Sequence, residues 1–168
     1  MGRAVLLLLA LAACDRPART GSPVLTSARD STDSAFTRLQ ARGHVAMGVD
    51  QYTSYHRFEA LPDGGRISLQ RDAGDTIGVA QIRSHMEKIK AAFARGDFAL
   101  PGLVHARDVP GTEVMAARRA RISYVTDTLP GGALLRLRTS DPSAINAIHR
   151  FLAFQRQDHR STSHGARD

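Results

Sequence analysis

The order of apolar and polar positions divides the chain into an apolar start, a polar stretch and a longer region with strand and helix periodicities. Residues 4–13 are apolar without interruption, whereas residues 15–42 are rich in Ser, Thr, Arg, Asp and Pro and carry only scattered apolar side chains. Such a stretch buries too little apolar surface to offset the entropy lost on ordering. We therefore expect a flexible tether over residues 14–42, with at most a helical turn near residues 35–41.

Two hairpins are predicted in residues 43–160, which have the length of one ordinary domain and precede a predicted disordered tail over residues 161–168. The segment FEALPDGGRISLQRD, residues 58–72, reads as strand, turn and strand, and SYVTDTLPGGALLRLRT, residues 123–139, repeats that order. The alternation directs one set of apolar side chains to the core: Phe58, Ile67, Leu69, Ile122, Tyr124, Leu135 and Leu137.

A segment with helical periodicity follows each hairpin. The first begins near Asp75 and ends before Gly96, and the second has Asp141 as its N-cap with Pro142 in its first turn. Their apolar stripes, at spacings of three and four, are Val79, Ile82, Met86, Ile89 and Phe93 in the first helix and Ile145, Ile148 and Leu152 in the second. A loop and then a short helix near Pro110–Arg119 are expected between the two halves.

The order of elements predicts an α+β fold of the form ββα–αββα. We expect a four-stranded, mainly antiparallel sheet with the two longer helices on one of its faces, because both helices need an apolar surface to cover.

The stripe of the second helix continues into polar residues, Gln155 and then His159. His56 alternates in register with Phe58, so an inward Phe58 carries His56 inward as well. A buried polar group needs a partner, because leaving it unsatisfied costs about 1–3 kcal/mol. Either the helix extends past the edge of the core and these residues are solvated, or His56, Gln155 and His159 face one polar pocket.

Further histidines are candidates for the same pocket or for a metal site. His85 flanks the stripe of the first helix, His105 lies in the central loop, and His149 lies off the stripe of the second helix. Neutral imidazole binds copper, zinc or iron, and a thioether would favour copper. The candidate thioethers are Met47, Met86 and Met115. No HExxH, HxxxH or His-x-His spacing occurs, so a metal site would have to be assembled from distant elements.

Enzyme motifs are absent from the sequence. No GxSxG elbow, P-loop or GxGxxG occurs. Asp158 beside His159 is a weak general-base candidate, because adjacent residues of a helix do not face each other. An enzyme is therefore only the third hypothesis, and no catalytic residue is assigned.

The single cysteine excludes an internal disulfide and a Cys-based metal site. The net charge of +7 comes almost entirely from arginine, since Lys88 and Lys90 are the only lysines. A basic protein in the cytoplasm would suggest nucleic acid as a partner. For an exported protein we expect none, and anionic head groups of a membrane are the nearer counter-charge.

The apolar start resembles the signal of bacterial lipoproteins. Arg3 precedes the apolar run, which is too short to span a bilayer, and the run ends in Leu11-Ala12-Ala13-Cys14, similar to a lipobox. The resemblance implies cleavage after residue 13 and lipidation of Cys14. It predicts a protein held by its acyl chains in the cell envelope, on the periplasmic side of the inner or outer membrane.

The strings MGVDQYTSYHRF, VHARDVPGTEVM and IHRFLAFQRQDH resemble a family of small bacterial proteins with no established activity, from Met47 to His159. The sequence thus predicts a lipid-anchored envelope protein whose small domain binds a protein partner or a small ligand. The alternative is an envelope protein that binds copper or zinc through its histidines. The candidate ligand- or metal-binding residues are His56, His85, His105, Met115, His149, Gln155 and His159.

Overall fold

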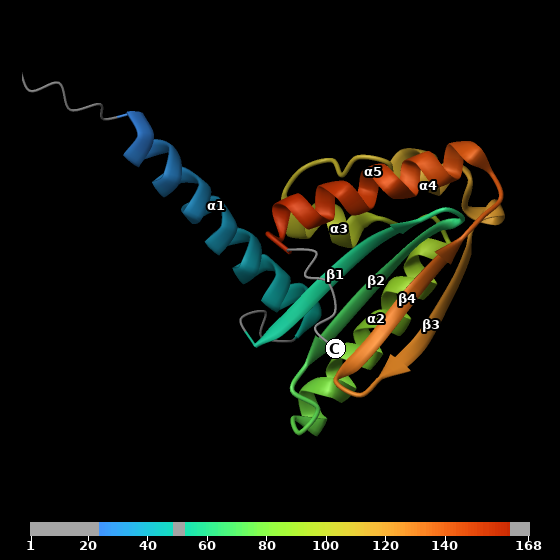
Figure 1. The fold of residues 1–168 in the computed structure, drawn as a ribbon, viewed down its shortest axis with the longest axis horizontal. Helices are drawn as coiled ribbons and strands as arrows, with labels where there is room; N and C mark the ends of the chain where they lie inside the picture. The colour runs from blue at the N-terminus through green and yellow to red at the C-terminus, as the bar shows by residue number, and fades with distance from the viewer. Residues whose placement is uncertain (1–23, 49–52, 162–168) are drawn as a thin grey trace, which may run out of the picture.

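A computed structural model describes residues 24–48 and 53–161 of the chain (Figure 1). The predicted signal segment, Cys14 and the tail from residue 162 lie outside the described residues. The elements are, in order, α1 (Val24–Met47), β1 (Ser54–Leu61), β2 (Gly64–Arg71), α2 (Thr76–Ala94), α3 (Ala99–His105), α4 (Thr112–Ala117), a 3-10 turn (Arg119–Arg121), β3 (Ser123–Leu129), β4 (Gly132–Arg138) and α5 (Pro142–Asp158).

The four strands form one antiparallel sheet in the order β1-β2-β4-β3. Each predicted hairpin is present, with Pro62 and Asp63 between β1 and β2 and with Pro130 and Gly131 between β3 and β4. The second strands of the two hairpins pair with each other at the centre of the sheet, where Ile67 lies opposite Leu135. The predicted ββα–αββα fold is confirmed.

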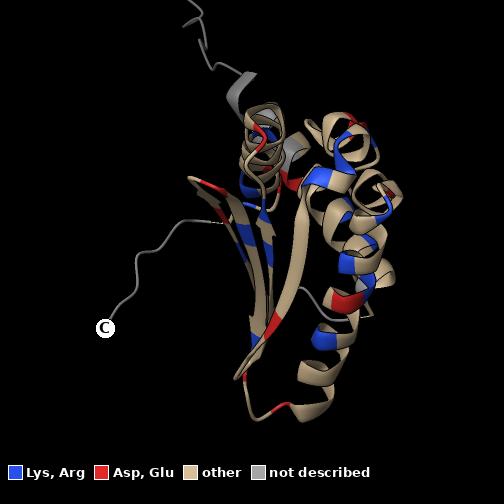
Figure 2. Cartoon of the chain, turned by 90° about the vertical axis from the view of Figure 1, so that its right-hand side faces the viewer, with Lys and Arg blue, Asp and Glu red and all other residues tan. Residues whose placement is uncertain are grey.

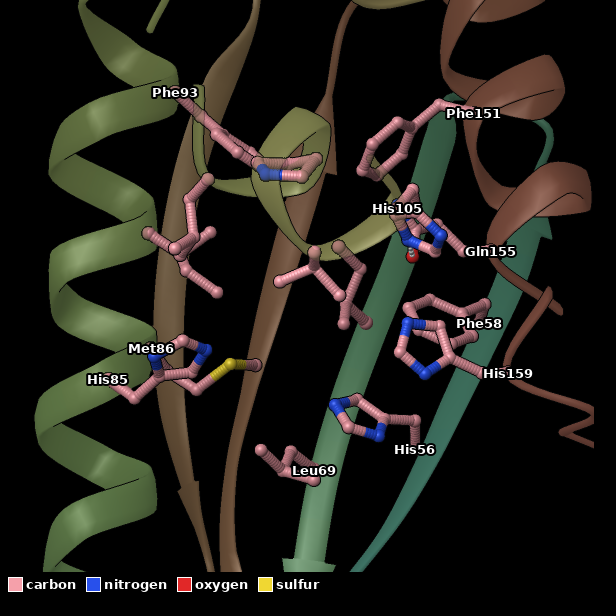
Figure 3. A pocket seen from close by; sticks show the side chains of 15 residues that line it. His56, Phe58, Leu69, His85, Met86, Phe93, His105, Phe151, Gln155 and His159 are labelled. Carbon is pink, nitrogen blue, oxygen red and sulfur yellow. Dashed lines mark hydrogen bonds between the residues drawn. The ribbon is translucent and has the colours of Figure 1, made fainter. Parts of the chain in front are cut away.

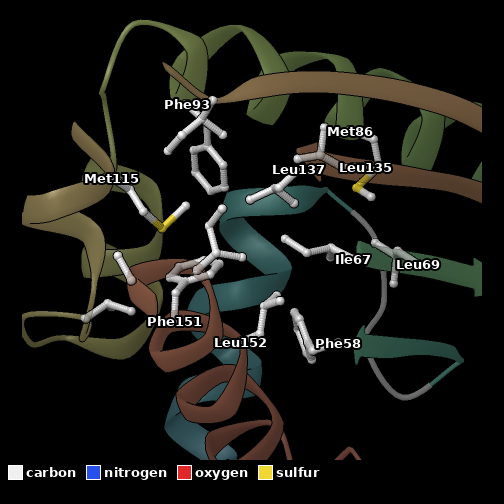
Figure 4. Packing of buried hydrophobic residues seen from close by; sticks show 14 of the residues in the cluster. Phe58, Ile67, Leu69, Met86, Phe93, Met115, Leu135, Leu137, Phe151 and Leu152 are labelled. Atoms are coloured by element: carbon white, nitrogen blue, oxygen red, sulfur yellow. The ribbon is translucent and has the colours of Figure 1, made fainter. Parts of the chain in front are cut away.

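The two longer helices cover the same face of the sheet, as predicted (Figure 2). α2 packs on β4 and β3, whereas α5 packs on β1 and β2. The apolar stripes of both helices meet the inward side chains of the strands in one core (Figure 4). Its fully buried members include Leu69, Ile82, Met86, Met115, Leu135, Leu137, Ile148, Phe151 and Leu152.

Side-chain caps begin both of these helices at the predicted residues. The carboxylate of Asp75 accepts a hydrogen bond from Gly78 N at 2.9 Å, and that of Asp141 accepts one from Ser143 N at 2.9 Å. Pro142 follows as the first residue of α5, where no intrahelical N–H is required. These caps fix the starting points of the helices and therefore the places at which their last turns lie.

The structure has a helix, α1, over much of the segment where composition predicts a tether. Phe36, Leu39 and Gly43 recur at spacings of three and four on one face of this helix, and Leu39 is only 3% exposed. The side chain of Arg42 donates from Nε to the carbonyl oxygen of Val104 at 2.7 Å. A short apolar stripe docked on α3 thus orders residues whose overall composition is polar.

A second difference lies in the central loop, where α3 forms over the sequence ALPGLVH. Pro101 stands in the first turn of this helix, where proline is tolerated because its missing N–H would be unpaired. The helix ends at Ala106, whose left-handed φ of 52° closes it. The predicted loop is therefore wrong over Ala99–His105.

No described helix combines the length and the apolar character that crossing a bilayer requires.

Candidate functional site

A cavity of about 70 Å³ lies between one end of the sheet and the helices α2, α3 and α5 (Figure 3). Four imidazoles and one amide supply the polar side chains of its wall, and the other side chains are apolar. The lining residues are His56, Phe58, Ile67, Leu69, His85, Met86, Ile89, Phe93, Leu100, Pro101, Val104, His105, Phe151, Gln155 and His159. We refer to this space as the histidine cavity.

The cavity brings together the two histidines that the strand and helix patterns directed to the same space. His56 and Phe58 face inward from β1, and their rings stack with centroids 5.6 Å apart. His159 caps the C-terminus of α5, and its ring centroid lies 4.9 Å from that of His56. The two rings are half-buried. The predicted convergence of His56 and His159 is therefore present, and the alternative of separately solvated residues is wrong.

Gln155 is buried and hydrogen-bonded rather than free in the cavity. Its side-chain oxygen lies 2.9 Å from Nε2 of His105, whose Nδ1 contacts the carboxylate of Asp158. The other oxygen of that carboxylate accepts a hydrogen bond from Arg107 at 2.7 Å. Both ring nitrogens of His105 thus have partners, and the chain of polar groups joins α3 to α5 along one wall of the cavity.

The ring of His105 lies edge-on to that of His159, with centroids 5.1 Å apart. His85 reaches the cavity from the opposite side, on α2, and is only 6% exposed. Met86 follows it in the sequence, and its thioether also lines the cavity. Four elements of the fold, β1, α2, α3 and the end of α5, therefore present imidazoles to one space, and α2 also adds a sulfur atom.

Burial keeps three of the imidazoles neutral at physiological pH. Desolvation, with a smaller contribution from Lys88, lowers the pKa of His85 to about 4. Desolvation and the neighbouring His105 lower the pKa of His159 to about 4, although Asp158 acts in the opposite direction. The pKa of His56 is lowered well below its usual range by desolvation and then by His159, His85 and His105. Neutral imidazoles carry a free lone pair that a ligand can use.

His56, His85 and His159 form no side-chain hydrogen bond with any described residue, in contrast to His105 and His149. Their polar atoms face an otherwise apolar space. These ring nitrogens are not among the buried side-chain atoms that lack a partner, so they are open to the cavity, and a ligand that enters it can reach them.

Two of the predicted candidates do not reach the cavity. Met115 is fully buried in the core on α4. His149 lies on α5 with its Nε2 2.9 Å from the carbonyl oxygen of Leu61, so it holds the end of β1. Met115 therefore contributes to the packing of the core, and His149 attaches α5 to the end of β1.

Two parts of the site were not predicted from the sequence: the wall contributed by α3 and the partner of Asp158. Leu100, Pro101 and Val104 line the cavity, but the segment that contains them was predicted to be a loop. The spacing of Pro101, Val104 and His105 fits one face of a helix and could have indicated it. Asp158, considered beside His159, instead pairs with His105, fifty-three residues away in the sequence.

Among the described residues, no three His, Cys, Asp or Glu side chains are grouped as the ligands of one metal ion. The predicted alternative, a copper or zinc site built from three of the histidines, therefore has no such group to support it in this part of the chain.

No family model, no curated protein and no solved structure matches the chain.

Proposed function

We propose that this protein is a lipid-anchored envelope protein whose α+β domain binds a very small ligand in the histidine cavity. The anchor rests on the resemblance of residues 11–14 to a lipobox. The binding function rests on the cavity, and its main support is that His56, His85 and His159 open into this apolar space and form no side-chain hydrogen bond with any described residue.

The size of the cavity limits the ligand. Sites for ordinary organic ligands have volumes of roughly 300–1,000 Å³. The histidine cavity has about 70 Å³, so its ligand is an ion or a molecule of a few atoms. A folded protein partner would bind to a surface, and the cavity gives no support to that alternative.

Catalysis receives less support than binding. The pair of His105 and Asp158 has the composition of a general base with its orienting carboxylate. However, the second nitrogen of His105 faces Gln155 at 2.9 Å instead of the open cavity. Among the described lining residues there is no Ser, Thr, Cys or Lys that this histidine could activate.

Thermal unfolding of the full chain in detergent tests the binding function. The probes are azide, formate, nitrite, imidazole and the ions Cu(I), Ag(I), Zn(II) and Ni(II), each added separately. A ligand that binds only the native state must raise the melting temperature. We expect at least one probe to do so in the unmodified protein and in His149→Ala, which changes a histidine outside the cavity.

The same probe should have no effect on His56→Phe, in which a ring without nitrogen replaces a polar wall of the cavity. Absence of stabilisation by every probe would overturn the binding function. Stabilisation that persists unchanged in His56→Phe would also overturn it, because the ligand would then bind elsewhere.

The anchor needs a separate experiment. Cys14→Ser removes the sulfur that the lipid is attached to, so the altered chain should leave the membrane fraction and lose metabolic labelling with palmitate. Membrane partition and labelling equal to those of the unmodified chain would contradict lipidation at Cys14.

A further inference from the structure

We infer that the ligand of the histidine cavity is the cuprous ion, Cu(I), bound by ring nitrogens of His56 and His159 and by the thioether of Met86. This inference rests on the proposed binding function and names the chemical class of the ligand. It uses three side chains from three elements: β1, α2 and the end of α5.

The first observation is the distance between the two imidazoles. Metal–nitrogen bonds are about 2 Å long, so two coordinating nitrogens lie at most about 4 Å apart. The ring centroids of His56 and His159 are 4.9 Å apart, and each ring carries nitrogens on its edge. Because each nitrogen lies about 1 Å from its ring centroid, nitrogens on facing edges of two rings at this separation fall within that limit.

The second observation is that the four imidazoles differ in their hydrogen-bond partners. His105 is held at both nitrogens, by Asp158 and Gln155, so it is a wall of the cavity and not a donor. His56 and His159 have no such partners among the described residues. The rings of His56 and His159 are also in contact with each other, whereas the ring of His85, on α2, makes no ring contact with either of them (Figure 3).

The third observation is a thioether in the same wall. Met86 is 1% exposed, and its sulfur points into the cavity from α2, across from the histidines (Figure 3). Sulfur of this kind is a soft ligand that selects Cu(I) and contributes little to the binding of zinc. Met115, equally buried, does not line the cavity and provides a matched comparison.

Charge also favours a monovalent ion. A divalent ion in an apolar space needs compensating anionic ligands, because removing its hydration is costly. The carboxylate that lies nearest along the polar wall, Asp158, already pairs with His105 and Arg107. Two neutral imidazoles and a thioether suit a soft ion with a single charge, and Cu(I) accepts so few ligands.

Competition with the chelator bicinchoninate tests the inference under anaerobic, reducing conditions, with the full chain in detergent. We expect the protein to remove one equivalent of Cu(I) per chain from the chelator, and one equivalent of Ag(I) in a parallel titration. X-ray absorption of the copper form should report two nitrogen ligands and one sulfur ligand. Zn(II) should not compete at equal concentration.

Variants locate the site. His56→Phe, His159→Phe and Met86→Leu should each weaken Cu(I) binding at least tenfold, whereas Met115→Leu and His149→Ala should bind as the unmodified chain does. Circular dichroism and thermal unfolding must first establish that each variant is folded. Should Met86→Leu fail to fold, the sulfur signal in the absorption spectrum of Cys14→Ser, which has no thiol, still tests the thioether.

The lipobox cysteine requires its own control, because a free thiol binds Cu(I). Cys14→Ser should retain the full equivalent of copper. Loss of binding in this variant, or equal binding in His159→Phe and Met86→Leu, would overturn the assignment to the cavity.

The two proposals fail in different ways. If Cu(I) does not bind but azide, formate or another probe raises the melting temperature in a manner that depends on His56, the copper assignment is wrong and the binding function stands. If no probe binds, both are wrong.

Discussion

The two ends of the core differ in how completely the side chains fill it. Near α4, the side chains of Met115 and Leu137 pack without solvent exposure. At the opposite end, between β1 and the last turn of α5, imidazoles surround a cavity, and those of His56 and His159 are only half-buried. The same helix, α5, contributes to both ends. The first end stabilises the fold, whereas the second end is less completely packed and holds the cavity in which we propose that the ligand binds.

Truncation of a side chain at the packed end should have the largest effect. Leu137 is fully buried between the sheet and the helices, and Leu137→Ala should lower the free energy of unfolding by about 2–5 kcal/mol. Urea denaturation followed by circular dichroism measures this change. A loss below about 1 kcal/mol would mean that this end of the core is as loosely packed as the cavity.

Lowering the pH should destabilise the protein through the imidazoles at the cavity end of the core. The histidines of the unfolded chain have pKa values near 6.5, whereas those of His85 and His159 are lowered to about 4 in the folded protein. Between these values the unfolded state binds more protons than the native state, so stability falls as the pH falls. Lys88, His105 and Asp158 are the charged or titratable groups that act on these two rings.

The measurement is the free energy of unfolding of the metal-free protein from pH 7 to pH 5, a range in which surface carboxylates stay ionised. Each difference of one pKa unit corresponds to about 1.4 kcal/mol, so a decrease of a few kcal/mol is expected over this range. His85→Phe and His159→Phe should each reduce the decrease. A flat profile would show that the imidazoles are protonated with little cost in the folded state.

Loss of the cap of α5 should affect both ends by a smaller amount. The Asp141 carboxylate accepts hydrogen bonds from Ser143 N and Ala144 N at 2.9 and 3.3 Å. Asp141→Ala should lower the free energy of unfolding by about 0.5–2 kcal/mol. Ser140→Ala, next to the cap but with no cap hydrogen bond, is the matched control for urea denaturation. Equal effects of the two substitutions would contradict a capping role.

The sequence predicted the regular parts of both ends. The strands and the longer helices follow from patterns that depend on local spacing. These patterns are the apolar stripes, the caps Asp75 and Asp141, and the two Pro-containing turns. The direction of His56 and His159 also followed from periodicity. Their proximity depended on where α5 crosses β1, and no local pattern contains that information.

The parts that were missed depend on contacts between distant segments. α1 is ordered by Leu39 and by the hydrogen bond from Arg42 to Val104, sixty-two residues away. The role of His105 depends on Asp158 and Gln155 in a helix at the other end of the domain. Composition describes how polar a segment is on average, but it cannot locate the single side chain that docks it.

Replacing the imidazole of His159 by a phenyl ring should produce the smallest change in the free energy of unfolding. It should also distinguish the two ends of the core most clearly. In His159→Phe, a ring of nearly the same shape replaces a half-buried imidazole whose pKa is already lowered by desolvation. Because removing a polar group without a partner from an apolar site relieves an unfavourable burial, the substitution should leave the free energy of unfolding unchanged or raise it by up to about 1 kcal/mol at pH 7. The ring can still contact His56 and Phe58, from which the centroid of His159 lies 4.9 and 5.6 Å away.

The same variant should lose Cu(I), since phenyl offers no lone pair. Urea denaturation and the chelator competition, performed on one preparation, therefore give opposite results for stability and binding. A residue retained for packing would show the reverse pattern, with a loss of stability of more than about 1 kcal/mol and unchanged copper binding. Met115→Leu, at the packed end, should leave copper binding intact and alter stability by less than about 1.5 kcal/mol, because the swap conserves volume. The pair of variants thus distinguishes a side chain that serves a ligand from one that serves the fold.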